Sequence, residues 1–187
     1  MYFVGVDQSL NHTGVFVLTD AGNVCSHVLL EPRYLSGPAR LVFIRDQLKT
    51  FFGSRRMRVS VLEGYSYNSM NRKFDLGEVG AIVKLALYDC SDAVYVAAPK
   101  QLKKFVSGNA SATKADVMNA IYHHWGVDIK NDNLADAYGL AQIARSVHVP
   151  RTRLRHQLDV VNEIIGAKVA KEKPARPRLS STFKGAV

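Results

Sequence analysis

The sequence predicts an α/β domain built on a mixed five-stranded sheet that is flanked by helices. Three apolar, β-rich runs separated by short polar turns open the chain, as expected for antiparallel strands that follow one another directly. Two further apolar runs come after and between segments of helical periodicity, which is the usual spacing of parallel strands joined by helices. The first half of the chain therefore predicts a sheet with both antiparallel and parallel pairs.

The opening strands are predicted to form a hairpin and one more antiparallel strand. Apolar runs flank a polar turn that contains Gly14, and a third run, Val24 to Leu30, follows the turn at residues 20–23. Asp7 then ends the first strand, where its side chain can face a cleft. An Asp at such a position is equally compatible with a turn residue that bonds its own backbone.

The second candidate acid follows an amphipathic helix predicted over residues 39–52. Arg58 to Leu62 is a short apolar run typical of a buried strand, and Glu63 comes directly after it. Ligand-binding groups gather at the carboxyl ends of parallel strands, so Glu63 is expected at the same edge of the sheet as Asp7. Taken without Asp7, Glu63 is explained as well by a solvated strand end.

The remainder of the domain is predicted to be helical apart from one buried strand at residues 93–97. The expected helices are 76–88, 100–106, 113–125 and 132–147. After Pro150, apolar positions at helical spacing with basic residues between them predict an amphipathic helix over 151–171, docked on the domain or on a second subunit. The predicted organisation is a domain over 1–148, a basic C-terminal helix over 149–171 and a flexible basic tail over 172–187.

Two more carboxylates open the last helix of the domain. Asp132 and Asp136 are four residues apart, so both lie on one helix face. Like charges at this spacing repel, and with no Lys or Arg in the same turn the pair needs a cation. The helix dipole gives another reason for acids in a first turn. Asn133, between them, can act as a substitute ligand or support one.

Taken together, these acids predict a divalent-metal site that cuts phosphodiester bonds. Mg²⁺ prefers hard oxygen ligands and is commonly held by a few carboxylates and substrate phosphates. Two such ions about 4 Å apart can activate the attacking water and stabilise the leaving oxygen, and Mn²⁺ is expected to substitute. The predicted catalytic and metal-binding set is Asp7, Glu63, Asp132 and Asp136.

Composition fits a polyanionic partner. The 187 residues carry a formal net charge of +9, and residues 145–187 supply +7 of it through ten Lys or Arg against three acids. Solvated tail charge explains the same excess. No apolar run approaches the ~20 residues of a membrane span, and the two cysteines form no disulfide or metal pattern. We expect an intracellular, cytoplasmic protein, in the host cytoplasm if phage-encoded.

Several short segments resemble the RuvC-type Holliday junction resolvases in order and spacing, with a pattern nearest to phage and organellar members. The resemblance covers roughly residues 1–148 and implies an RNase H-like nuclease fold. It also implies a homodimer with two active sites and Mg²⁺-dependent, paired nicks in four-way DNA junctions, as used in recombination, repair or phage DNA processing. The matching segments are Gly5-Val6-Asp7, Thr13-Gly14, Leu62-Glu63, residues 76–80, Ala98-Pro99 and residues 132–137.

The resemblance assigns the acids and adds DNA-binding residues. Asp7, Glu63 and Asp136 match the acidic positions of the family, and Asp132 fills the remaining role one position away from the common bacterial spacing. The family has lysines that reach the DNA backbone near the cut, and Lys103 and Lys114 match their positions. We expect Lys100 to bind substrate as well. Ordinary helix-surface charge is the plainer reading of these lysines.

Two positions depart from the bacterial pattern. Gln8 and Ser9 replace the Pro-Gly that usually follows the first acid, which changes the turn but leaves the acid in place. The aromatic wedge expected just past the Glu has no Phe at the usual place. Tyr65 and Tyr67 are the candidates, either to stack on a base at an opened junction or to pack over the sheet.

Other functions remain open at the sequence level. Asp7 with Thr13-Gly14 also resembles the first phosphate loop of sugar kinases and actin-like ATPases, but these need two such domains and a second glycine-rich loop, which 187 residues do not supply. A catalytically silent DNA-binding protein would not require all four acids. A nuclease of the same fold could instead cut flaps, forks or RNA in hybrids.

Overall fold

The computed structural model describes residues 1–64, 73–149 and 154–166. Its five strands are β1 (Tyr2–Asp7), β2 (Thr13–Thr19), β3 (Val24–Leu30), β4 (Met57–Glu63) and β5 (Ser91–Ala97). They form one sheet in the order β3-β2-β1-β4-β5, in which the β1–β2 and β2–β3 pairs are antiparallel and the β1–β4 and β4–β5 pairs are parallel. The predicted mixed sheet is confirmed, and β1 lies at its centre.

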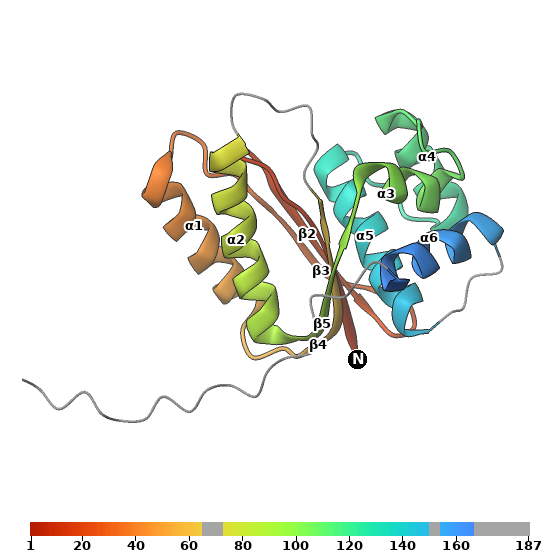
Figure 1. The fold of residues 1–187 in the computed structure, drawn as a ribbon, viewed down its shortest axis with the longest axis horizontal. Helices are drawn as coiled ribbons and strands as arrows, with labels where there is room; N and C mark the ends of the chain where they lie inside the picture. Colours follow the sequence, from red (N-terminus) through yellow and green to blue (C-terminus); the bar gives the residue numbers. More distant parts are fainter. Residues whose placement is uncertain (65–72, 150–153, 167–187) are drawn as a thin grey trace, which may run out of the picture.

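Helices cover both faces of the sheet (Figure 1). One face carries α1 (Gly37–Phe52) and α2 (Lys73–Cys90), and the other carries α3 (Pro99–Ser107), α4 (Lys114–Trp125), α5 (Asp132–His148) and α6 (Arg155–Gly166). Each predicted helix of the domain is present within a few residues of its expected limits. No helix in these described ranges combines the length and apolar content that a membrane crossing requires.

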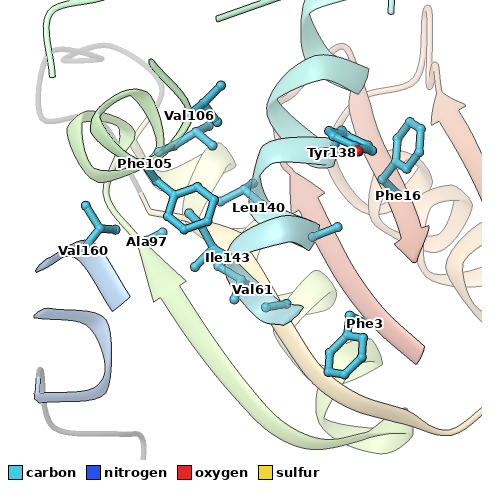
Figure 2. Packing of buried hydrophobic residues seen from close by; sticks show 14 of the residues in the cluster. Phe3, Phe16, Val61, Ala97, Phe105, Val106, Tyr138, Leu140, Ile143 and Val160 are labelled. Atoms are coloured by element: carbon cyan, nitrogen blue, oxygen red, sulfur yellow. The ribbon is translucent and has the colours of Figure 1, made fainter. Parts of the chain in front are cut away.

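The alternation of side chains along the strands divides the core into two clusters. On the α5 side, Phe3 and Val61 pack with Tyr138, Leu140 and residues of α3 (Figure 2). On the other side, the intervening strand residues pack against α1 and α2. Both sides of the central strands are therefore buried, as the nearly continuous apolar runs of β1 and β4 require.

Two glycines let α5 lie directly against the sheet. A Cβ atom at Gly5 of β1 would stand 2.0 Å from the backbone oxygen of Ala137, and one at Gly14 of β2 would stand 2.4 Å from that of Asn133. Any side chain at either position would push the helix off the strands. The close approach brings the first turns of α5 over the end of β1.

The C-terminal helix docks on its own chain. Val160, Val161 and Ile164 join the core cluster on the α5 side, and the side-chain amide of Gln157 donates to the Phe105 backbone carbonyl at 3.2 Å. Part of the apolar stripe is thus buried within the chain, while Leu154 and Ile165 remain exposed.

The structure describes only residues 149 and 154–166 of the basic helix predicted over 149–171. Val149 and Leu154 are not helical, and the described helix begins at Arg155, which forms an ion pair with Asp159 at 3.3 Å. The other basic residues of this region, and the predicted tail over 172–187, lie outside the described residues.

Candidate active site

Two strand ends bring the first two acids side by side. Val6 of β1 pairs with Leu62 of β4, so Asp7 and Glu63 follow at adjacent positions on neighbouring parallel strands. Each has the same strand parity as the residues that contact α5, so both side chains lie on the α5 side of the sheet. Asp7 is only 6% exposed, although it carries a carboxyl group.

The first turns of α5 supply the other acids. The side chain of Asn131 caps this helix by accepting the Leu134 backbone N–H at 3.0 Å. Asp132 is the first helical residue, and Asp136 lies one turn later. The charge of Asp7 raises the pKa of Asp136, which places the two side chains within electrostatic reach.

Two lysines reach the same place from α3 and α4. A reciprocal cap at Thr113 and Asp116 starts α4, with backbone-to-side-chain hydrogen bonds of 2.9 and 3.2 Å. Lys114 is the first helical residue after that cap, and its ammonium group forms an ion pair with Asp132. Lys103 projects from α3 towards the same acids and lowers the pKa of Glu63 through its charge.

These groups line one open cavity of about 350 Å³, called here the acidic cavity. Its walls include Asp7, Glu63, Asp136, Lys103 and Lys114. Asp132 stands beside it through the ion pair with Lys114 and is about a third exposed. Residues that are far apart in the sequence are thus gathered at the carboxyl ends of the central strands, as predicted.

Burial and mutual repulsion raise the pKa of three of the acids. Desolvation is the largest cause for each, and it raises the pKa of Asp136 to about 7. The pKa of Asp7 is raised well above its usual value, with the Glu63 charge as the next cause, and that of Glu63 is also raised by burial. In contrast, the hydrogen bond from Lys114 lowers the pKa of Asp132. The cavity therefore holds more acidic groups than its lysines neutralise.

Lys114 changes one part of the sequence interpretation. No cation lies in the same turn as Asp132 and Asp136, but Lys114, which precedes Asp132 by 18 residues, reaches the pair from another helix. Within the described ranges no group of three His, Cys, Asp or Glu side chains could hold a metal ion as arranged. The neighbouring Glu63 contributes to the raised pKa of Asp7, and Lys114 forms an ion pair with Asp132. Ion binding would therefore require displacement of protons and reorientation of side chains.

The remaining predicted residues have different outcomes. Lys100 is exposed in the first turn of α3 and is not among the residues that line the acidic cavity. Asn133 does line it, and its amide donates to Asp132 at 3.3 Å. Tyr65 and Tyr67 lie outside the described residues.

Sequence reasoning missed the role of Gln8 in this arrangement. Its side-chain amide donates to the backbone carbonyl of Glu63 at 3.0 Å and so joins the ends of β1 and β4. Gln8 also lines the acidic cavity. Its place directly after Asp7 was the only available signal, and spacing alone gave no indication of the contact.

Comparison with known families gives a match over most of the chain. The sequence model of the family described as crossover junction endodeoxyribonuclease RuvC matches residues 3–144. A curated relative, the crossover junction endodeoxyribonuclease RuvC of Zymomonas mobilis, is 27% identical over 147 residues, which span 75% of this chain and 88% of the relative. α6 lies beyond the matched residues.

Solved structures agree in fold. The structure of Thermus thermophilus RuvC superposes with a TM-score of 0.68 at 19% identity, covering 80% of this chain and 97% of the other. The same protein in complex with its Holliday junction substrate gives a TM-score of 0.67 at 19% identity, with 75% and 90% covered. The likeness confirms the RNase H-like fold that the sequence resemblance implied.

Proposed function

This chain belongs to the RuvC family of crossover junction endodeoxyribonucleases, and we propose that it resolves four-way DNA junctions at the acidic cavity. Family membership gives the reaction class, endonucleolytic cleavage of crossover-junction DNA. The observation that carries the assignment of the site is the meeting of Asp7, Glu63 and Asp136 with Lys103 and Lys114 in one cavity.

The donor set of the cavity fits Mg²⁺, and Mn²⁺ as a substitute. Its carboxylates are hard oxygen donors, and burial followed by mutual repulsion raises the pKa of Asp7 and Asp136, so a divalent cation would stabilise their ionised forms. The ligands we propose are Asp7, Glu63, Asp132 and Asp136. When bound, a pair of such ions supplies Lewis-acid charge to the scissile phosphate and lowers the pKa of the attacking water.

The protein's own residues hold the DNA and exchange protons. The ammonium groups of Lys103 and Lys114 attract a phosphate to the mouth of the cavity, while buried carboxyls alone would repel it. Without a metal ion, burial raises the pKa of Asp136 to about 7, so binding of a cation would release a proton from this residue near neutral pH. Lys114 is shared between Asp132 and the incoming phosphate, which couples DNA binding to the charge of the acids.

We propose a homodimer, because a four-way junction needs one nick in each of two opposing strands. A two-fold axis would relate one active site per chain. α2 supports this arrangement, since Phe74 is 91% and Leu85 61% exposed on its surface. We propose that the protein acts in the cytoplasm, the host's if it is phage-encoded.

The proposal is tested by cleavage of matched substrates with Mg²⁺. Purified protein is offered a four-way junction, a three-way junction, a flap, a fork and linear duplex, each labelled on one strand at a time. We expect symmetric nicks in the four-way junction alone. Preferred cutting of flaps or forks would reassign the substrate, and binding without cleavage would indicate a silent DNA-binding protein.

Asp7→Asn is the variant that ties the activity to the site. It removes a charge from the cavity without altering shape, so cleavage should fall by at least about a thousandfold while junction affinity changes by less than about threefold. Single-turnover cleavage and a gel-shift titration in Ca²⁺ measure the two effects. Asp20→Asn, in the turn between β2 and β3, is the control. Wild-type rates in Asp7→Asn would remove this residue from the mechanism.

A further inference from the structure

Gln8 is a buried polar residue whose side-chain amide nitrogen has a hydrogen-bond partner and whose amide oxygen has none among the described residues. It follows Asp7 at the end of β1, is 7% exposed and lines the acidic cavity. Its amide nitrogen donates to the Glu63 backbone carbonyl at 3.0 Å. A carbonyl only accepts hydrogen bonds, so the amide must present its nitrogen there and turn its oxygen elsewhere.

That oxygen has no partner among the described residues. Gln8 Oε1 is buried and forms no hydrogen bond with them. An unpaired buried amide oxygen costs about 1–3 kcal/mol, so a buried site of this kind requires a partner. Carboxylates and DNA phosphates are themselves acceptors, which leaves a cation or a donor such as water or ammonium.

We propose that Gln8 is a further ligand of the divalent-cation site, which it binds through Oε1. This inference rests on the proposed function, because Asp7 and Glu63 must bind the same cation. Amide oxygens belong to the hard ligands used for such ions. A neutral ligand also suits this cavity, since another carboxylate would add to the repulsion that raises the pKa of Asp7 and Asp136.

The competing explanation is that Gln8 only clips β1 to β4 through its nitrogen. Two substitutions separate these roles. Gln8→Met keeps the length of the side chain but removes both the nitrogen and the oxygen. Gln8→Glu keeps an oxygen in the same place, adds a charge and loses the N–H donor to the Glu63 carbonyl.

The experiment is a Mn²⁺ titration of the full-length protein without DNA, followed by electron paramagnetic resonance. Gln8→Met should weaken Mn²⁺ binding by about tenfold, whereas Gln8→Glu should bind at least as tightly as wild type. Gln157→Met is the matched control, because Gln157 is a buried glutamine whose amide also donates to a backbone carbonyl, that of Phe105, away from the acidic cavity. It should leave Mn²⁺ binding unchanged.

Each other outcome overturns the assignment. Wild-type Mn²⁺ affinity in Gln8→Met would exclude Gln8 as a ligand. Equal weakening of Mn²⁺ binding in both Gln8 variants would leave only its role in linking β1 to β4 through the amide nitrogen. If thermal melting shows that Gln8→Met is unfolded, Gln8→Glu decides alone, since the clip predicts weaker binding and the ligand does not. Failure of the proposed metal site is distinguishable, because then wild type and Asp7→Asn would show the same lack of Mn²⁺ binding.

Discussion

At the scale of single residues, the acidic cavity stores electrostatic free energy that other interactions of the fold offset. One buried and two half-buried carboxyls lie close together, and each has a pKa above that of a carboxyl in water. A protein selected only for stability would not keep this arrangement. The lysines of the cavity offset part of the cost, and Lys114 directs its hydrogen bond to Asp132, the most exposed of the four acids.

The raised pKa of Asp136 should make the stability of the folded chain depend on pH. A carboxyl whose pKa rises on folding destabilises the folded chain progressively as pH increases from about 4 through about 7. Asp136→Asn should therefore raise the melting temperature in EDTA, by at least about 3 °C more at pH 8 than at pH 5. Asp132→Asn is the control: Lys114 lowers the pKa of Asp132, so this carboxylate is ionised at both pH values and its substitution should lower the melting temperature about equally at pH 5 and pH 8. An equal gain at both pH values would contradict the raised pKa of Asp136.

The two lysines of the cavity should be separable from the general positive charge. Lys103→Ala and Lys114→Ala should each reduce the log-log salt slope of junction binding by about 0.9 if each contacts one phosphate. Lys114→Ala should also move the acid limb of the cleavage profile to higher pH, since the charge of Lys114 lowers the pKa of Asp7 and Asp136. Lys49→Ala, on α1 across the sheet, should change neither quantity. An unchanged slope would leave these lysines as surface charge.

At the scale of elements, α6 is an integral part of the domain although it follows the residues that match the family. It buries Val160, Val161 and Ile164 in the main core. It also contacts α3 through Glu163, which accepts hydrogen bonds from Gln101 at 3.1 Å and from Lys104 at 3.4 Å. Since α3 carries Lys103, α6 supports one wall of the acidic cavity from behind.

Two truncations should distinguish the helix from the residues beyond it. Removal of residues 151–187 uncovers the core face of α3 and should lower the free energy of unfolding by at least about 3 kcal/mol, as expected for the loss of several buried aliphatic side chains. Removal of 167–187 alone takes away six Lys or Arg and one Glu. It should weaken junction binding at ~0.15 M salt without a change in melting temperature. Full affinity in the shorter truncation would exclude a DNA-binding tail.

At the scale of the whole molecule, most of the fold could be predicted from local patterns, whereas the site could be predicted only in part. β1, β4 and α5 were predictable because apolar periodicity and their terminal acids are local signals. The ion pair of Lys114 with Asp132 was not, because it depends on how α4 and α5 pack. The contact of Gln8 with the Glu63 carbonyl likewise depends on strand register, which the sequence does not state.

The quaternary structure provides the last prediction. Mass measurement at micromolar concentration should give about twice the 20.7 kDa of the chain. Leu85→Asp on α2 should yield monomers that remain folded, because this side chain is 61% exposed in the single chain. Tyr122→Asp, 57% exposed on α4 across the sheet, should stay dimeric. Monomers of the wild type, both free and on junction DNA, would favour an enzyme that nicks one strand at a time.

The glycine contacts between α5 and β1 have a consequence for the stage of protein synthesis at which the acidic cavity can form. β1 is synthesised first and lies at the centre of the sheet, but the helix that rests on Gly5 and supplies Asp132 and Asp136 is synthesised more than a hundred residues later. A ribosome-bound chain can pair its early strands, yet it lacks two of the four carboxylates until α5 has been synthesised. The acidic cavity therefore cannot assemble before α5 has been synthesised, however early the strands of the sheet begin to pair.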